Sequence, residues 1–302
     1  MQLLRPLAGP IVLDGAMGTE LIERGLQIRA DIAERWVLER ADEVSAIHRA
    51  YVSAGAQAVQ TCTFGALRTR LAPYGLQHQV KSICQTAVSL ARAAADGRAV
   101  IASLGPTGVV VRAGSSGLAH QIEAEVAEAA AALTGADVIH LETQLSPEEL
   151  VASAAGIRSA APHLPLWISV TLMTGASGLE TPHGVSLARM LKALAEAKPD
   201  AIGVNCSLDA DRIRDAVERL VDADLGPVVA RPQARVSEKC ATGRSSETPT
   251  RFAERAARLF DLGAAAVGGC CGTSPASIAA LSALVPGHTR DPMGPATQEL
   301  TR

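Results

Sequence analysis

Residues 265–273 read Ala-Ala-Val-Gly-Gly-Cys-Cys-Gly-Thr, a short apolar run that ends in two adjacent cysteines between glycines. Consecutive side chains of a strand point to opposite faces, so both thiols can face one point only if the strand ends there. The flanking glycines supply that freedom, because they adopt backbone angles that other residues avoid. The stretch therefore predicts a strand from Ala265 to Cys270 that ends in a paired thiol site.

This run is the last of eight of its kind. Short apolar segments alternate with alanine-rich segments of helical period along the whole chain, a pattern typical of βα units around a parallel sheet. The eight predicted strands are 10–13, 58–62, 99–104, 138–142, 166–172, 201–206, 227–231 and 265–270. The predicted helices are 43–54, 79–95, 118–133, 147–160, 187–197, 210–221, 249–262 and 275–284.

Eight βα repeats predict an α/β protein whose fold is a (β/α)8 TIM barrel in a single domain, residues 1–285. Residues 286–302 lack periodicity, and we predict that they form a flexible C-terminal tail. A doubly wound open sheet is the alternative. Against it, the first βα turn, Asp14-Gly-Ala-Met-Gly18, lacks the spacing of a dinucleotide-binding fingerprint.

The composition is that of an ordinary globular protein, and it excludes several functional classes. The chain has 302 residues, 48% of them hydrophobic, with a net charge of −3 and a pI of about 6.2. This slightly acidic balance does not indicate binding to nucleic acid or to an anionic membrane, so we predict neither partner. The chain begins without the sustained apolar segment of a secretory signal, and we expect a cytoplasmic protein. The composition does not predict an oligomeric state.

The ends of the predicted strands indicate where chemistry takes place, because barrel active sites lie at the carboxyl ends of the strands. Residues at or just past those ends are Asp14, Cys62, Gly105, Glu142, Thr171, Cys206, Arg231, Cys270 and Cys271. Thiols and carboxylates should therefore converge on one mouth of the barrel.

Cys206, Cys270 and Cys271 are the candidate metal ligands. Cys206 closes the apolar run Gly203-Val-Asn-Cys-Ser207 just as the cysteine pair closes its own run. Three thiolates from two strand ends would form an open Zn²⁺ site whose fourth position is free for water or substrate. Two alternatives remain: buried cysteines that act as small hydrophobes, and a strained vicinal disulfide, which would not persist in a reducing compartment.

The motifs at these strand ends resemble those of the homocysteine S-methyltransferase family. That family includes betaine- and S-methylmethionine-dependent homocysteine methyltransferases and the homocysteine domain of cobalamin-dependent methionine synthase. The resemblance runs from Asp14 to about Ser277. Its motifs are Asp-Gly-Ala-Met-Gly-Thr (14–19), Thr-Phe-Gly-Ala (63–66), Leu-Gly-Pro-Thr (104–107), Leu-Glu-Thr (141–143), Val-Asn-Cys (204–206) and Gly-Gly-Cys-Cys-Gly-Thr (268–273).

The resemblance implies a homocysteine-binding barrel in which a zinc-bound homocysteine thiolate attacks a methyl group on a small donor and yields methionine. A free thiol of pKa about 8.5 is mostly protonated at neutral pH, and a coordinating metal deprotonates it. We therefore expect zinc to activate the substrate sulfur rather than water.

The resemblance also implies residues that bind the amino-acid part of the substrate. Asp14 and Glu142 are candidates for the ammonium group, and the backbone amides of Gly15, Ala16 and Met17 are candidates for the carboxylate. The alternative for Asp14 is a turn or N-cap residue ahead of a short helix near Thr19, and for Glu142 it is a solvated strand end.

The chain departs from the family pattern at three places. Cys62 stands between threonines where relatives usually carry Asn, and Leu67 stands where another Asn is frequent. Residues 231–235, Arg-Pro-Gln-Ala-Arg, replace a Pro-Asn-Ala-Gly-like stretch. For Cys62, a core position, a fourth zinc ligand and a donor-pocket position are all possible. The polar segment 237–248 is a candidate lid over the mouth.

We expect the methyl donor to be a small molecule or a separate methyl-carrying protein, because 302 residues leave no room for corrinoid or folate modules. Cages for quaternary ammonium groups are rich in aromatic residues. Only Trp36, Phe64, Tyr74 and Trp167 could contribute here, which favours a sulfonium donor, S-methylmethionine or S-adenosylmethionine, over betaine. Three alternatives stay open: another small thiol as acceptor, methyl exchange with a separate corrinoid protein, and a non-catalytic paralogue that binds zinc or an amino acid.

Overall fold

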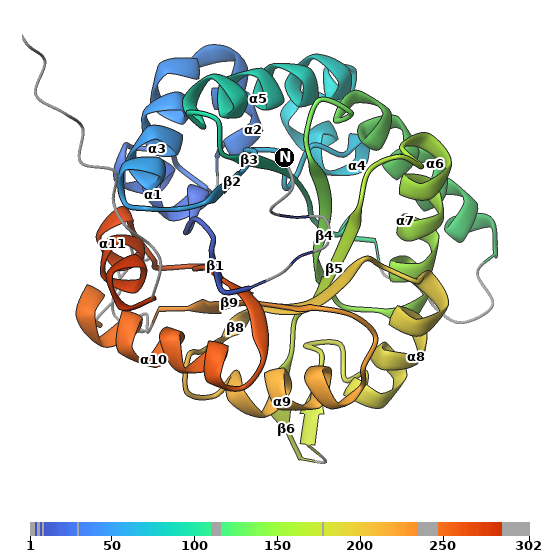
Figure 1. The fold of residues 1–302 in the computed structure, drawn as a ribbon. Helices are drawn as coiled ribbons and strands as arrows, with labels where there is room; N and C mark the ends of the chain where they lie inside the picture. The colour runs from blue at the N-terminus through green and yellow to red at the C-terminus, as the bar shows by residue number, and fades with distance from the viewer. Residues whose placement is uncertain are drawn as a thin grey trace, which may run out of the picture.

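The computed structural model describes Leu4, Leu7 and residues 9–28, 30–109, 116–176, 178–234 and 247–285. A ring of helices surrounds one sheet of eight parallel strands (Figure 1). These strands are β1 Ile11–Val12, β2 Ala58–Gln60, β3 Ala99–Leu104, β4 Val138–Gln144, β5 Leu166–Val170, β8 Ala201–Asp209, β9 Val228–Gln233 and β10 Ala264–Val267.

The sheet closes on itself. Its strand order is β1-β10-β9-β8-β5-β4-β3-β2, and a parallel bridge between Leu13 and Ala58 joins the two outer strands. The backbone N–H of Gln57 also donates to the carbonyl of Val12 at 2.8 Å. The predicted single-domain TIM barrel is therefore confirmed. The predicted tail, 286–302, and nearly all of the predicted lid, 237–248, lie outside the described residues.

The helices agree closely with the sequence pattern where a Ser or Thr is followed by Pro. Ser146 and Thr248 each accept the backbone N–H three residues on, and Ser274 forms a capping box with Ser277, with proline at the first turn in all three cases. The helices are α1 Met17–Glu23, α2 Ala33–Glu39, α3 Ala41–Ser53, α4 Arg68–Leu71, η1 Ala72–Tyr74, α5 Val80–Ala94, α6 Ser116–Ala132, α7 Pro147–Ala160, α8 Leu187–Ala197, α9 Arg214–Asp222, α10 Pro249–Asp261 and α11 Pro275–Leu284.

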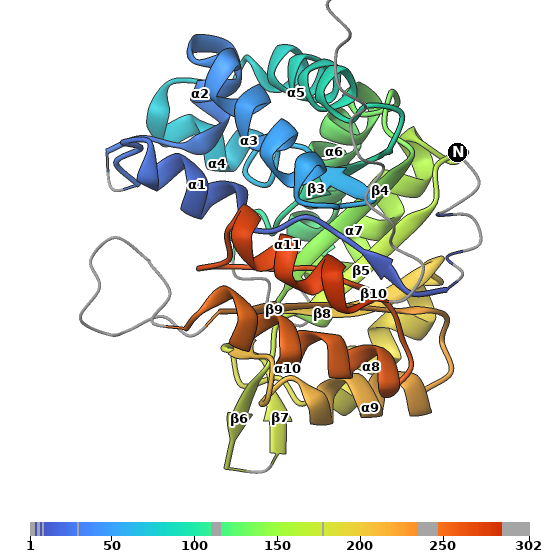
Figure 2. The same ribbon diagram turned by 60° about the vertical axis from the view of Figure 1, so that its left-hand side comes forward.

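Some predicted boundaries were wrong for identifiable reasons. Helix α9 begins at Arg214 rather than at Ala210, because Asp209 Oδ1 accepts the N–H groups of Asp211 and Arg212 and holds a turn there. Helices α2 and α4 and a two-stranded hairpin, β6 Met173–Gly175 with β7 Gly178–Glu180, were not predicted. Figures 1 and 2 show this hairpin projecting from the barrel beside α9.

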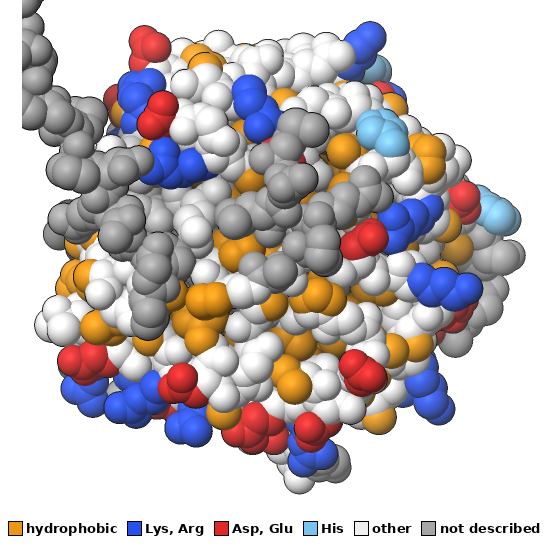
Figure 3. Space-filling model, in the orientation of Figure 1, with side chains coloured by type: hydrophobic (Ala, Val, Ile, Leu, Met, Phe, Trp, Pro, Cys, Tyr) orange, Lys and Arg blue, Asp and Glu red, His pale blue; other side chains and the backbone are white. Residues whose placement is uncertain are grey.

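The amino ends of the strands are sealed by apolar side chains. Leu4 and Leu7 pack with Ile101, Val138 and Trp167 in a cluster that also includes the first residues of other strands. Figure 3, in the orientation of Figure 1, shows hydrophobic side chains gathered near the centre of that face and charged ones toward its edge. A second, larger cluster lies between the strands and the helices. None of the helices in the described ranges is both long and apolar enough to cross a membrane.

Candidate metal and substrate site

The three predicted cysteines come together. The Sγ atoms of Cys206, Cys270 and Cys271 all lie within 4.8 Å of one another, and those of Cys206 and Cys271 are 3.8 Å apart. Two thiolates on one tetrahedral zinc, with Zn–S bonds of about 2.3 Å, would be separated by about 3.8 Å. Cys270 and Cys271 are thiols, so the alternative of a vicinal disulfide is not realised. The spacing of the three sulfur atoms suits a metal of this size.

Irregular backbone brings these sulfur atoms together. Cys206 lies inside β8 rather than at its end, and it adopts a φ of 61° where the pairing of β8 with β9 shifts register between Asn205 and Asp209. A positive φ is costly for a residue with a side chain and is concentrated at functional sites. The local turn replaces the regular alternation of side chains, so Cys206 joins the cluster from a strand interior.

The loop of the cysteine pair is held by its neighbours. Strand β10 ends at Val267, and the Cys270 N–H then donates to the Pro232 carbonyl at 2.8 Å. A Cβ on Gly268 would lie 2.7 Å from the Asp14 carbonyl oxygen, and one on Gly269 would collide with Thr273. These two glycines are therefore required for space. The unusual backbone angle expected of the flanking glycines is found at Gly272, which has a φ of 78°.

The chemistry of the cluster favours a bound cation. Hydrogen bonding to Cys206 raises the pKa of Cys271 to about 12, and it raises that of Cys270 well above the usual value, with burial adding to both. Three adjacent thiols ionise together only if a positive charge compensates them, and a coordinating metal deprotonates a thiol. Cys206, Cys270 and Cys271 therefore fit a thiolate-preferring metal such as zinc.

Asp14 lies in a buried network rather than at a helix cap. Its Oδ2 accepts the Gln60 backbone N–H at 2.7 Å, and its Oδ1 accepts from Arg231 Nη2 at 2.9 Å. The N-cap of α1 is Ala16, and no side chain caps that helix, so the alternative of an Asp14 cap is wrong. Burial raises the pKa of Asp14, and Arg231 opposes that rise by favouring the charged form.

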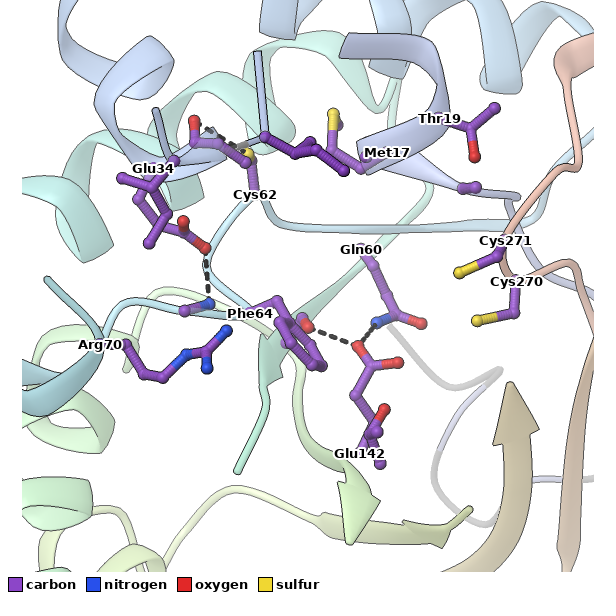
Figure 4. Close-up of a pocket in the computed structure, with 18 of the residues that line it drawn as sticks. Met17, Thr19, Glu34, Gln60, Cys62, Phe64, Arg70, Glu142, Cys270 and Cys271 are labelled. Atoms are coloured by element: carbon purple, nitrogen blue, oxygen red, sulfur yellow. Dashed lines mark hydrogen bonds between the residues drawn. The ribbon is translucent and has the colours of Figure 1, made fainter. Parts of the chain in front are cut away.

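Glu142 projects from β4 into the same network (Figure 4). Its Oε1 accepts from Gln60 Nε2 at 2.7 Å and from Ser103 Oγ at 2.5 Å, and its Oε2 accepts from Asn205 Nδ2 at 3.2 Å. Only 8% of the residue is exposed, so Glu142 is not a solvated strand end. Burial raises its pKa, while Arg231 acts in the opposite direction.

The turn before α1 is tied to the cysteine loop. The Ala16 N–H donates to Thr273 Oγ1 at 3.1 Å, and that hydroxyl donates to the Cys270 carbonyl at 2.7 Å. A Cβ on Gly15 would lie 2.8 Å from both Thr273 Oγ1 and the Tyr51 ring. The predicted substrate-binding turn is thus packed directly against the predicted metal ligands.

Comparison with known proteins places this arrangement in a family. A model of the homocysteine S-methyltransferase family matches residues 11–285. The chain belongs to this family. It is 32% identical over 302 residues to homocysteine S-methyltransferase of Escherichia coli (strain K12), covering 90% of this chain and 94% of that protein. The members of this family are described as homocysteine S-methyltransferases.

Two further comparisons are with a longer protein and with a solved structure. Methionine synthase of Mycobacterium tuberculosis (strain ATCC 25618 / H37Rv) is 31% identical over 297 residues, which cover 91% of this chain and 24% of that protein. The chain thus spans about a quarter of that relative. Among solved structures, the metallated form of homocysteine methyltransferase MmuM from Escherichia coli has a TM-score of 0.69 and 28% identity, covering 93% of this chain and 99% of that one.

In this barrel, a cavity of about 610 Å³ extends from the cysteines to a second wall on its opposite side. Glu34, Cys62, Phe64 and Arg70 line the side opposite the cysteine pair (Figure 4). The volume lies within the range of about 300–1,000 Å³ that is usual for small-molecule sites. The cavity can therefore hold a small ligand beside the thiols.

Cys62 lies in the second wall, apart from the cluster of Cys206, Cys270 and Cys271. Its Sγ contacts the Ala33 carbonyl oxygen at 3.6 Å, and burial raises its pKa well above the usual value. Among the described residues, the cysteine group that could hold a metal does not include it. Cys62 is thus a buried wall residue, and Leu67, the other departure nearby, is fully buried.

Sequence reasoning missed two buried polar residues of the cavity. Gln60 bridges Asp14 and Glu142, but in the sequence it is only one polar residue at the end of an apolar run. Glu34 accepts the Gly65 N–H at 2.5 Å, and burial raises its pKa. Glu34 lies on the unpredicted helix α2, and its charged neighbours in the sequence give no sign that this carboxylate turns inward.

Proposed function

We propose that this protein is a zinc-dependent S-methyltransferase that moves a methyl group from a small sulfonium donor to homocysteine and gives methionine. The observation that carries the proposal is the convergence of three thiols within 4.8 Å, at a cavity that also holds two buried carboxylates. The family match supports the reaction class.

Cys206, Cys270 and Cys271 would hold the zinc ion, whose positive charge would keep a substrate thiol ionised at neutral pH. The protein's part is to hold the three sulfurs in place through the contacts of Cys270 with Pro232 and Thr273. A site preorganised in this way spends little binding energy on reorganisation when the acceptor enters.

The acceptor's amino-acid group would lie over the buried network. Glu142 is the strongest candidate for the ammonium group, because its Oε2 has one hydrogen bond of 3.2 Å while its Oε1 has two shorter ones. Of the predicted amides, the Ala16 N–H already donates to Thr273, which leaves Gly15 and Met17 for the carboxylate. Both oxygens of Asp14 have partners, so its part in ammonium binding would be indirect.

The second wall of the cavity supports a sulfonium donor, S-methylmethionine or S-adenosylmethionine. Phe64 and Tyr74 line the cavity, whereas Trp167 lies in the apolar cluster at the opposite end of the barrel. Two rings offer less than the aromatic cage that a quaternary ammonium group prefers. Glu34 and Arg70 on the same wall have opposite charges, so the charge of this wall does not by itself favour one donor.

A donor and acceptor screen tests this function. Zinc-loaded protein is incubated with homocysteine or another small thiol and each of S-methylmethionine, S-adenosylmethionine, betaine and a methyl-corrinoid protein, and the products are identified by mass spectrometry. Methionine formed from a sulfonium donor is the expected result. Methylation of a different thiol only would show that homocysteine is not the acceptor. Turnover only with an added methyl-corrinoid protein would show that the donor is not a small sulfonium compound. Bound zinc without turnover of any pair would instead indicate a zinc- or amino-acid-binding protein.

A further inference from the structure

Arg231 places a buried positive charge where the family resemblance predicts only carboxylates. It lies in β9 with 4% of its surface exposed, and its Nη2 donates to Asp14 Oδ1 at 2.9 Å and to the Gly15 carbonyl at 3.4 Å. Asp14 and Glu142 both favour its charged form electrostatically. The network under the cavity therefore already contains a cation before any ammonium group arrives.

One nitrogen of this guanidinium is left without a partner. Arg231 Nη1 is buried and has no hydrogen-bond partner within the described residues. It lies close to Gly268, whose added Cβ would be 3.2 Å away, and the residue lines the cavity that the cysteines also line. Guanidinium groups bind carboxylates well because their donors match the two oxygens, and a buried donor without an acceptor is costly.

A complementary acceptor atom lies on the same network. Gln60 Nε2 donates to Glu142 Oε1, which orients the amide and leaves Gln60 Oε1 buried without a hydrogen-bond partner in the described chain. The network thus lacks one acceptor for Arg231 and one donor for Gln60. An amino-acid group supplies both, since its carboxylate accepts and its ammonium donates.

We infer that Arg231 binds the carboxylate of the acceptor and makes the site specific for thiols that carry a carboxylate. This inference rests on the proposed function, in which the acceptor sulfur lies at the three cysteines. Asp14 is then a positioning residue that orients Arg231, and the ammonium group lies toward Gln60 Oε1 and Glu142. A carboxylate that also reaches the Gly15–Met17 turn would be held by donors on both sides, because Arg231 already contacts Gly15.

A binding cycle tests the inference without a methyl donor. Calorimetry gives the Kd of homocysteine and of 3-aminopropane-1-thiol, which is homocysteine without its carboxylate, for the zinc-loaded parent and for Arg231→Gln. If Arg231 pairs with the carboxylate, the substitution weakens homocysteine by about tenfold or more and changes the aminothiol by less than about twofold. Equal weakening of both thiols, or of neither, would overturn the inference.

A second variant controls for misfolding of Arg231→Gln, in which the buried carboxylate of Asp14 has lost its ion-pair partner. The double variant Asp14→Asn, Arg231→Gln removes both charges together and should show the same selective loss of homocysteine. If the zinc-loaded parent binds neither thiol, the acceptor of the proposed function fails together with this inference. If both thiols bind and lose affinity equally in the variants, the proposed function stands and the inference alone is rejected.

Discussion

Asp14 and Arg231, 217 residues apart in sequence, form an ion pair of 2.9 Å in which 3% and 4% of the side chains are exposed. The pair joins the loop after β1 to β9. Asp14 also accepts the Gln60 N–H, and Glu142 also favours the charged form of Arg231, while Arg231 Nη1 has no partner among the described residues. The pair therefore links the loop after β1 to β9, past the intervening strand β10, through one buried contact.

Asp14→Ala should destabilise the protein by about 3–5 kcal/mol, because removing one member of a buried pair leaves the Arg231 guanidinium without its ion-pair partner. Urea unfolding followed by circular dichroism measures the loss. The matched control is Asp215→Ala, which breaks the exposed Asp215–Arg219 pair of α9 and should cost less than about 1 kcal/mol. Equal costs for the two substitutions would show that burial does not matter at Asp14.

Cys271→Ala should remove most of the metal from the protein. The parent, purified without added zinc, should carry about one zinc ion per chain, because its three thiols form an open site with no ligand to spare. Elemental analysis by mass spectrometry measures the content. Cys84→Ala is the matched control, since this buried thiol lies on α5 away from the cluster and its loss should leave the zinc in place. Unchanged zinc in Cys271→Ala would remove that residue from the site.

The barrel and the meeting of three cysteines at one point could be predicted because their signals are local. The spacing of eight apolar runs defines the strands, and the pair Cys270-Cys271 at the end of one of them has few structural explanations. The ion pair of Asp14 could not be predicted, because its partner lies 217 residues away and its contact depends on the closure of the sheet. An arginine near a strand end has the same pattern whether it points to solvent or inward.

The backbone conformation at the cysteine cluster could not be predicted from the sequence either. Cys206 was expected at a strand end, yet β8 continues to Asp209, and only a φ of 61° turns the thiol toward its partners. The role of Gly268 and Gly269 was misjudged for the same reason. A glycine can be needed for its backbone angle or because a side chain would not fit. Which of the two applies depends on neighbours such as Asp14 and Thr273, which come from distant parts of the chain.

Gly269→Ala should impair metal binding although it removes no ligand. The added Cβ would collide with Thr273, whose hydroxyl accepts from the Ala16 N–H and donates to the Cys270 carbonyl, so the cysteine loop must move. We expect zinc to dissociate about tenfold faster or more, a change of about 1.4 kcal/mol or more, as measured with a chromogenic chelator. Gly117→Ala in α6 has open space around its Cβ and is the control, with unchanged zinc release. Equal release rates in both variants would refute the role of space at Gly269.

His48 should make the protein less stable as the pH falls from about 6.5 to 4. The side chain is fully buried in α3, and burial lowers its pKa to about 4, with a smaller effect from Arg49 in the same direction. In the unfolded chain its pKa is about 6.5. Between these values the unfolded state binds a proton that the folded state does not, so stability falls as pH falls, by at most about 1.4 kcal/mol per pH unit from this residue.

His48→Leu isolates this contribution. The variant removes the titrating ring and two ring nitrogens that have no hydrogen-bond partner within the described ranges. Urea unfolding at pH 7, 6 and 5 should show that the difference in stability between variant and parent widens in favour of the variant as the pH decreases. Because other groups titrate equally in both proteins, the difference reports His48 alone. Parallel losses in parent and variant would mean that His48 takes up its proton at the same pH in the folded and unfolded chain.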